Sequence, residues 1–260
     1  MIFELILVSV VILTGLVTLY DRIVFLRFKK VNSGEYQQGI IREYCVSFFP
    51  VLLLVLVFRS FLADPWRIPS GSMKPTLLEG DFIVVNKFKY GLRLPVVGTK
   101  VLEIGTPERG DIVVFKNKKL GMVMIKRVVG IPGDHIQYSD NKLFVNDKEM
   151  LTNNTGIEQD HIIDYGVSVP VLKKEENLLG VKHDIYVREG HGDMKYNIED
   201  IVVPEGHYFM VGDNRNNSND SRYWGLVSEN DLLGKALLTV LSWDNTYKDI
   251  RWSRFGKVIK

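Results

Sequence analysis

The hydrophobic pattern divides the chain into two unlike parts. From Ile2 to Leu19 almost every residue is apolar. A helix of this length, rising about 1.5 Å per residue, would measure roughly 27 Å, close to the thickness of a bilayer core. A second apolar run, from Val46 to Leu62, carries Arg59 near its end, where a long side chain can reach the membrane surface. The pattern therefore predicts two membrane-spanning helices, at residues 1–20 and 46–63.

The charges around the first run decide between a spanning helix and a cleaved signal peptide. A signal peptide has a basic segment before its apolar core, whereas here Glu4 precedes that core and the basic residues follow it. Residues 21–45 hold more Lys and Arg than Asp and Glu. Because basic loops remain in the cytoplasm, we expect residues 21–45 to form a cytoplasmic loop and residues 64–260 to lie on the opposite face.

Beyond Asp64 the pattern changes to short apolar runs separated by Gly, Pro, Asn and Asp, which is typical of β-strands joined by turns. No long segment of this region has helical periodicity. The chain is therefore predicted to be mainly β outside its two apolar helices. Strands are expected at residues 82–85, 111–115, 122–129, 202–203 and 208–211.

Two segments of the β region each allow two interpretations. Residues 137–206 are more polar and less regular, and they form either an inserted second β lobe or a set of long surface loops. From Trp243 to Lys260 aromatic and basic residues alternate, which fits either a final strand or a segment that contacts the membrane surface. Both pairs of interpretations stay open at this point.

Composition excludes several classes of protein. The 33 Lys and Arg nearly balance the 31 Asp and Glu, so bulk charge gives no support for nucleic-acid binding. A content of 46% hydrophobic and 25% charged residues excludes wholesale disorder and a polytopic transporter. The single cysteine, Cys45, excludes an intrachain disulfide and any CxxC zinc or redox site. No HExxH motif or comparable metal cluster is present.

Two segments are candidate sites of chemistry, and each also allows a purely structural interpretation. From Ile68 to Leu77 two serines flank a glycine between two prolines, which suits a rigid loop that holds a hydroxyl outward, although an ordinary turn has the same composition. In the strand 121–130, Lys126 and Arg127 point to opposite faces, and both faces are apolar. Arginine stays charged when buried, whereas lysine can lose its proton. A lysine at a sheet edge, paired with an acid, is the alternative.

A third segment, from Gly212 to Gly225, is densely polar and ends in Tyr223-Trp224, which indicates that it packs against the body of the protein and supports a site. Its charged residues, which can form alternating ion pairs, are Asp213, Arg215, Asp220 and Arg222. A serine nucleophile needs a base. None of the five histidines lies in a triad-like motif, and no Gly-x-Ser-x-Gly elbow is present. A neutral lysine remains as the candidate base.

Taken together, these segments resemble the bacterial type I signal peptidases, or leader peptidases. The matching motifs are Pro69-Ser-Gly-Ser-Met73, Gly80-Asp-Phe-Ile-Val-Val85, Arg109-Gly-Asp-Ile-Val-Val-Phe115, Ile125-Lys-Arg-Val-Val-Gly130, Gly212-Asp-Asn-Arg215 and Ser218-Asn-Asp-Ser-Arg222. The resemblance implies a signal-peptidase-like β fold with a small second lobe. It also implies a membrane-bound serine endopeptidase that removes signal peptides from exported preproteins, placed in the bacterial cytoplasmic membrane with its catalytic domain on the periplasmic face.

The resemblance also implies the roles of individual residues. Ser72 would be the nucleophile and Lys126 the general base, and the oxyanion hole would combine the Ser72 amide with the Ser70 hydroxyl. Ser218 would orient the lysine amine. Asp220 and Arg222 would form a supporting ion pair, with Asp213 and Arg215 nearby.

The family's substrate pockets accept preproteins with small residues at positions −1 and −3. The pocket residues implied here are Ile68, Met73, Met124 and Ile125. Many relatives carry an aromatic residue where this chain has Met124, so an altered pocket shape is expected. Membrane lipid is the other expected partner, with Trp66, Ile68, Met73 and Leu77 dipping into its surface. No cofactor or metal is implied.

Two other hypotheses for the function compete with a signal-peptide-removing endopeptidase. A self-cleaving repressor-type protease also uses a serine and a lysine, but it should be soluble and carry a DNA-binding domain. A non-catalytic, membrane-anchored β module that binds exported chains would make the serine and lysine incidental, and replacing both would then have no effect.

Overall fold

A computed structural model describes residues 2–31, 39–59, 63–93, 99–139, 142–162, 166–188 and 198–260. The predicted loop 21–45, the end of the second predicted span and the predicted lobe 137–206 therefore lie partly outside the described residues. The chain divides into two compact units. The first comprises residues 1–63 and 91–103, and the second comprises residues 64–90 and 104–260.

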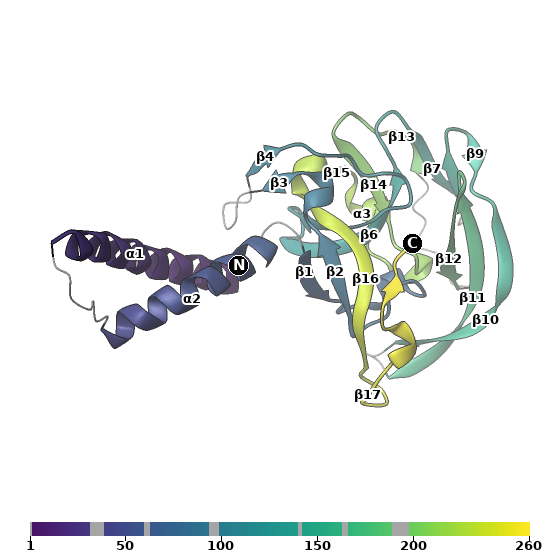
Figure 1. Ribbon diagram of the computed structural model, residues 1–260. Coiled ribbons are helices and arrows are strands. Elements are labelled where there is room, and N and C mark those ends of the chain that lie inside the picture. The colour runs from purple at the N-terminus through teal and green to yellow at the C-terminus, as the bar shows by residue number, and fades with distance from the viewer. Residues whose placement is uncertain are drawn as a thin grey trace. The chain divides into compact units, whose positions relative to one another are not determined.

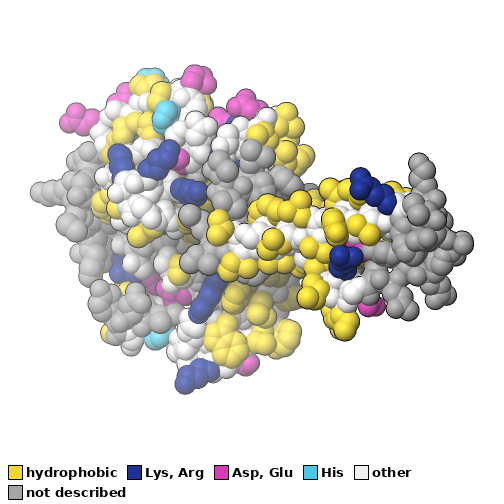
Figure 2. All heavy atoms as spheres, turned by 90° about the vertical axis from the view of Figure 1, so that its left-hand side faces the viewer, with side chains coloured by type: hydrophobic (Ala, Val, Ile, Leu, Met, Phe, Trp, Pro, Cys, Tyr) yellow, Lys and Arg dark blue, Asp and Glu magenta, His cyan; other side chains and the backbone are white. Residues whose placement is uncertain are grey.

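The first unit is built on two long apolar helices, α1 (Ile2–Val31) and α2 (Ile40–Val57) (Figure 1). Both are long and apolar enough to cross a membrane. Their large side chains face outward, with Leu13 63% and Ile41 78% exposed, and yellow hydrophobic side chains spread over this part of the surface in Figure 2. A soluble protein rarely leaves so much apolar surface in water, so these faces are suited to lipid.

The helix boundaries differ from the predicted ones. α1 continues past residue 20 to Val31, and α2 begins at Ile40 instead of Val46, so much of the predicted loop 21–45 is helical. The reason is local, because residues 20–31 contain neither Gly nor Pro and nothing in them terminates a helix. The unit also contains a short hairpin, β3 (Leu92–Arg93) and β4 (Lys100–Leu102).

The second unit is organised around one large sheet with the order β1-β2-β16-β5-β6-β14-β15 (Figure 1). Its strands are β1 (Ala63–Arg67), β2 (Asp81–Asn86), β5 (Ile112–Asn117), β6 (Met122–Gly130), β14 (His207–Val211), β15 (Val227–Ser228) and β16 (Leu232–Asp244). Four of the five predicted strands match β2, β5, β6 and β14 to within two residues at each end. Only residue 202 of the fifth lies in a strand, the end of β13 (Ile198–Val202).

The described residues between His135 and Val202 form strands of two further sheets, so the surface-loop interpretation is wrong. A separate β lobe with the bounds 137–206 stays a prediction. One sheet has the order β13-β7-β8-β9, with β7 at His135–Ser139, β8 at Lys142–Val145 and β9 at Lys148–Glu149. The other has the order β10-β11-β12, with β10 at Thr152–Ile162, β11 at Val167–Leu178 and β12 at Val181–Val187.

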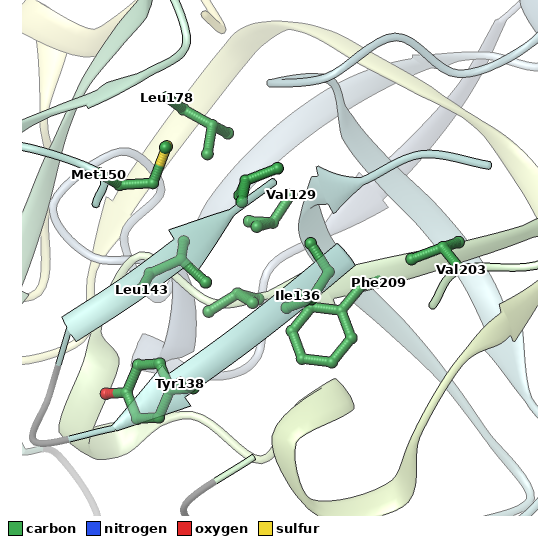
Figure 3. Packing of buried hydrophobic residues seen from close by; sticks show 10 residues of the cluster. Val129, Ile136, Tyr138, Leu143, Met150, Leu178, Val203 and Phe209 are labelled. Atoms are coloured by element: carbon green, nitrogen blue, oxygen red, sulfur yellow. The ribbon is translucent and has the colours of Figure 1, made fainter. Parts of the chain in front are cut away.

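This lobe shares its hydrophobic core with the large sheet. Figure 3 shows Ile136, Tyr138 and Leu143 of β7 and β8 packed in one cluster with Val129 of β6 and Phe209 of β14. All five side chains are almost fully buried. The lobe is therefore part of the same folded body as the large sheet, although it interrupts that sheet in sequence.

A second core cluster contains Ile68, Met73 and Leu77 together with apolar residues of β2 and β5. These three side chains are 2%, 0% and 0% exposed. The expectation that they dip into a membrane surface is therefore wrong, because their side chains lie in the hydrophobic core. Trp66 packs against the same cluster and is only partly buried.

The last residues fold back onto the large sheet. β17 (Asp249–Ile250) and β18 (Lys257–Val258) pair with β16, which confirms strand structure in the tail. The guanidinium of Arg254 binds the carboxylate of Asp81, with Nε and Oδ1 2.9 Å apart. Trp252 is nevertheless 70% exposed, so contact of the tail with a membrane stays a prediction.

The remaining elements are single turns. They are η2 (Gly71–Met73), η3 (Phe88–Tyr90), η5 (Arg215–Asn217), α3 (Ser221–Trp224), η6 (Glu229–Asp231) and η7 (Trp252–Arg254). Of these, η2, η5 and α3 carry residues of the site.

Candidate active site

The Ser-Gly-Ser segment lies in a tightly tied loop between β1 and β2. Backbone hydrogen bonds from Ile68 N to Asp81 O, 2.8 Å, and from Gly80 N to Ile68 O, 2.9 Å, close the base of the loop. Ser72 lies on η2 and is 8% exposed. Its carbonyl accepts a 3.1 Å hydrogen bond from the amide of Asn214, so the loop is also fastened to the Gly212–Gly225 segment.

β6 delivers the candidate base to this serine. It pairs with β5 along its length and with β14 at its end, and the alternation of the strand sends Lys126 and Arg127 to opposite faces. The pattern predicts that one or both cations are poorly solvated, and both are buried, at 3% and 1% exposure. The Lys126 Nζ and Ser72 Oγ atoms are 2.6 Å apart, although the residues are 54 positions apart in the chain.

The surroundings of Lys126 favour its neutral form. Burial lowers the pKa of its amine from 10.5 to about 8, although the charges of Asp220 and Asp213 oppose this effect. A neutral amine within hydrogen-bond distance of a serine hydroxyl can accept its proton, so the pair has the geometry and the pKa of a base and nucleophile.

Lys126 also differs from the other buried cations in its partners. Within the described part of the chain, five buried cations pair with a carboxylate, namely Lys74, Arg127, Arg215, Arg222 and Arg254. Lys126 has no carboxylate within salt-bridge distance among the described residues, and its amine faces a hydroxyl instead. An unpaired buried charge is costly, so this position favours the deprotonated amine.

The other serines with predicted roles are less fully placed. The Ser70 Oγ lies 3.4 Å from the Ser72 Oγ on the exposed side of the loop, where it could reach a developing oxyanion. Ser218 is buried, and its hydroxyl has no hydrogen-bond partner among the described residues. Both roles, oxyanion donor and orienter of the amine, therefore stay predictions.

The Gly212–Gly225 segment is held by buried ion pairs. Asp220 and Arg222 form the expected pair, with contacts of 2.8 Å and 2.9 Å, and Asp220 also accepts the Gly212 amide. The expectation that Asp213 and Arg215 complete a set of pairs within the segment is wrong. Their partners come from elsewhere in the fold, because Asp213 binds Arg127 of β6 at 2.7 and 2.8 Å and Arg215 binds Glu176 of β11.

These carboxylates stay charged despite their burial. Burial raises the pKa of Asp213 and of Asp220, but Arg127 and Arg222 respectively outweigh it, and both pKa values are lowered. Burial acts in the same direction on Glu176, and Arg215 and His183 bring its pKa down to about 2. The pairs are thus permanent parts of the structure at neutral pH, and breaking one would leave an uncompensated buried charge.

An apolar cleft of about 300 Å³ opens beside the Ser72–Lys126 pair. Three of the predicted pocket residues, Ile68, Met124 and Ile125, line this cleft, together with Ser70 and both members of the pair. The fourth, Met73, does not line it and is completely buried in the core beneath, so its assignment to the pocket is wrong. The side chain of Met73 points inward because η2 turns Ser72 toward the cleft.

Several residues near the site were not predicted from sequence. Lys74, Asp160, Glu176 and His183 are all buried around the loop and the polar segment. Asn214 belongs to a matching motif, but no role was assigned to it. Lys74 could have been identified from the sequence, because a lysine is unusual in a loop of Ser, Gly and Pro. The hydrophobic pattern gives no sign that residues of β10, β11 and β12 lie near the site. No group of His, Cys, Asp and Glu suited to a metal occurs in the described ranges.

Known proteins resemble this chain over most of its length. A family model described as signal peptidase, peptidase S26, matches residues 41–243. A signal peptidase I from Pseudomonas fluorescens is 42% identical over 275 residues, which cover 93% of this chain and 92% of that protein. One from Pseudomonas aeruginosa is 41% identical over 272 residues, with the same two shares. One from Haemophilus influenzae is 30% identical over 322 residues, which cover 99% of this chain and 92% of that protein.

Proposed function

This chain belongs to the signal peptidase family, peptidase S26, and we propose that it is a membrane-anchored serine endopeptidase that removes signal peptides from exported preproteins with a Ser72–Lys126 dyad. One observation carries the assignment of the dyad. The only buried cation without a carboxylate partner in the described part of the chain lies 2.6 Å from the hydroxyl of the serine in the Pro-Ser-Gly-Ser-Met motif.

The chemistry follows from these positions. Neutral Lys126 accepts the Ser72 proton while Ser72 Oγ attacks the scissile carbonyl, and the protonated amine then gives its proton to the leaving amine. Water attacks the acyl-enzyme, with Lys126 again as base, and releases Ser72. The Ser72 amide and the Ser70 hydroxyl stabilise the oxyanion, and such a donor contributes about 2.7–4 kcal/mol.

The substrate adds to the sheet as an extended strand beside β6. β14 pairs with β6 only at residues 127–130 in the described part of the chain, so the edge that leads to Lys126 is available for main-chain hydrogen bonds. The cleft beside it is apolar and closed by Ile68, Met124 and Ile125, which fits small side chains at positions −1 and −3. Met124 lines this cleft with a flexible, unbranched side chain, so the cleft differs in shape from one that has an aromatic residue at this position.

The apolar helices anchor the enzyme. The proposed spans lie within Leu5–Arg27 and Ile40–Val57 and revise the limits predicted from the pattern. The basic residues around the connection between them support a cytoplasmic position for it, so the proposal puts the catalytic β region, residues 64–260, on the periplasmic face of the cytoplasmic membrane. Tethering enzyme and preprotein to one membrane raises their effective concentration, and surrounding lipid is a partner.

The test is cleavage of a labelled preprotein by the detergent-solubilised enzyme. Ser72→Ala and Lys126→Arg should form no product, since alanine has no nucleophile and guanidinium stays protonated. Ser253→Ala and Lys118→Arg, at exposed positions, are the matched controls and should cleave normally. Full activity of either dyad variant would overturn the assignment and favour a non-catalytic β module that only binds exported chains. A self-cleaving repressor is not favoured, because the relatives of this chain are signal peptidases.

A further inference from the structure

A buried ion pair lies directly behind the nucleophile. Lys74 follows Met73 in the loop, and its Nζ lies 3.0 Å from the Oδ1 of Asp160 on β10 and 2.7 Å from the carbonyl oxygen of His161. Lys74 is 8% and Asp160 1% exposed. Neither residue lines the apolar cleft, so neither contacts a substrate bound in it.

Lys74 folds back over the glycine that separates the two serines. A Cβ placed on Gly71 would lie 3.0 Å from Cε and 3.2 Å from Nζ of Lys74. The carboxylate of Glu79 closes the other side of the amine at 3.5 Å. The lysine therefore packs against the backbone that precedes Ser72.

Asp160 reaches the same loop by a second route. Its Oδ2 accepts hydrogen bonds from Asn214 Nδ2 at 3.0 Å and from Arg188 at 3.1 Å. Asn214 in turn donates its Nδ2 to the carbonyl of Gly71 and its backbone amide to the carbonyl of Ser72, each at 3.1 Å. The carboxylate of Asp160 on β10 thus binds both residues that contact the backbone of the loop, Lys74 and Asn214.

We propose that the Lys74–Asp160 pair positions the nucleophile loop, so that the β10–β11–β12 sheet controls the alignment of Ser72 with Lys126. Both are positioning residues that act through Gly71, Ser72 and Asn214. The inference rests on the proposed function, because alignment matters only if Ser72 reacts.

The expected effect is on the chemical step. Displacing a reacting group by about 1 Å can cost 100-fold in rate. Lys74→Met, which keeps a long unbranched side chain and removes the charge, should lower kcat about 10- to 100-fold. KM should stay within about threefold, because interactions with bound substrate are unchanged. Asp160→Asn should have a similar effect, since it weakens both routes to the loop.

The double variant distinguishes positioning from separate structural defects. Each single change breaks the same Lys74–Asp160 contact and leaves Lys74 with only Glu79, or Asp160 with only Arg188, whereas the double change removes both members of the pair. The loss in kcat for Lys74→Met/Asp160→Asn should therefore be clearly smaller than the product of the two single losses. Lys74→Arg keeps a cation that can reach Asp160 and should recover part of kcat.

The measurement is kcat and KM for a labelled preprotein with the full-length enzyme in detergent, at a temperature well below the unfolding midpoint of every variant. Lys182→Met is the matched control, because this lysine forms an exposed ion pair with Glu175 in the same sheet, and its kcat should equal that of the wild type. The midpoint of the pH–rate profile should not move in the Lys74 variants, since they change the alignment of the base and not its surroundings.

Several outcomes would overturn the proposal. One is a kcat within about twofold of the wild type for both folded single variants, and another is single losses that multiply in the double variant. If a single variant does not fold, the double variant decides, because wild-type kcat in it would overturn the proposal and a reduced kcat with unchanged KM would support it. Equal cleavage by wild type and Ser72→Ala would overturn the proposed function itself. Normal kcat in the Lys74 and Asp160 variants beside an inactive Ser72→Ala would overturn only this inference.

Discussion

At the residue scale, the proposed chemistry depends on one amine that is buried without a counter-ion among the described residues. Lys126 and Arg127 are neighbours on β6 with nearly equal burial, yet Arg127 has Asp213 as partner and Lys126 has the hydroxyl of Ser72. Arginine cannot give up its proton in a protein, so a buried arginine needs an anion. Lysine can release its proton instead, so Lys126 can be buried beside a hydroxyl without an anion.

The pH dependence of activity should follow the amine of Lys126. With a pKa of about 8, the reactive neutral form is a minor fraction at pH 6 and the major one at pH 9. We therefore expect kcat/KM to rise about tenfold per pH unit below pH 7 and to level off above pH 9. Initial rates of preprotein cleavage between pH 5 and 10 would measure this. A profile governed by a group near pH 4 would contradict the lysine base and indicate carboxylate chemistry.

The same amine should make the enzyme less stable below its pKa. Folding lowers the pKa of Lys126 from 10.5 to about 8, so the folded protein binds its proton less tightly than the unfolded chain does. The resulting cost is on the order of 3 kcal/mol. It is present in full below pH 8, decreases between pH 8 and 10.5, and disappears above. Lys126→Met removes the group and should unfold at higher urea concentration than the wild type at pH 7, although it is inactive.

The control for this prediction is the pH dependence of the difference itself. The difference in unfolding free energy between Lys126→Met and the wild type should decrease as the pH rises from 7 to above 10. Lys118→Met, at a side chain that is 74% exposed, should show no such pH dependence. A Lys126→Met variant that is less stable than the wild type at pH 7 would show that the hydrogen bond to Ser72 outweighs the cost of burying the amine.

At the scale of elements, the sequence predicts best what a single strand determines. Alternation along residues 122–130 predicts that Lys126, Arg127 or both are poorly solvated, since each face of the strand is apolar. It does not predict their partners, because these depend on which strands come together. Asp160 follows eight exposed residues of β10 and is itself buried, and no periodicity in that polar strand marks it. The ion pairs of Arg215 and Lys74 were missed for the same reason.

At the junction after β14, residues of three matching motifs lie against one another. A Cβ on Gly212 would lie 2.1 Å from the Ser218 Oγ and 2.6 Å from the Ser72 carbonyl oxygen. No rotation of a side chain relieves the second contact, because it involves backbone. Gly212→Ala should therefore push the Ser72 loop away from Lys126 and lower kcat by about 100-fold or more.

Preprotein cleavage by Gly212→Ala is best compared with Gly39→Ala. A Cβ on Gly39 would meet no atom within 4 Å, and the glycine has an ordinary φ of −69°, so this variant should cleave normally. Wild-type kcat in a folded Gly212→Ala enzyme would mean that the loop can move without loss of alignment, and would weaken the positional account of the site.

At the scale of the whole molecule, the sequence predicts the division into apolar helices and a β region but not how the β region is joined. The helices are recognised from long apolar runs, and only their ends were misplaced, because the basic residues after the first run continue the helix. The segment 137–206 could not be assigned to a core in advance. Its buried residues are scattered among polar ones and pack against β6 and β14, which lie outside it.

The shared core predicts that the second unit unfolds as one body. Leu143 lies on β8, far along the chain from Ser72, and is 2% exposed in the cluster that also contains Phe209 of β14. Leu143→Ala should lower the free energy of unfolding by about 2–5 kcal/mol. Because β14 leads into the Gly212–Gly225 segment, the active site should be lost in the same transition. Urea titrations followed by circular dichroism and by preprotein cleavage should give one common midpoint, shifted together by the substitution.

Leu151→Ala is the control, since this leucine also lies within residues 137–206 but is 67% exposed. It should change the free energy of unfolding by no more than about 0.5 kcal/mol. If the lobe were a separate folding body, Leu143→Ala would split the titration, and cleavage would persist at urea concentrations where part of the β structure is already gone. The position of Asp160 makes that outcome informative, because a lobe that unfolds alone would take the partner of Lys74 with it. Persisting cleavage would then show that Ser72 stays aligned without the lobe.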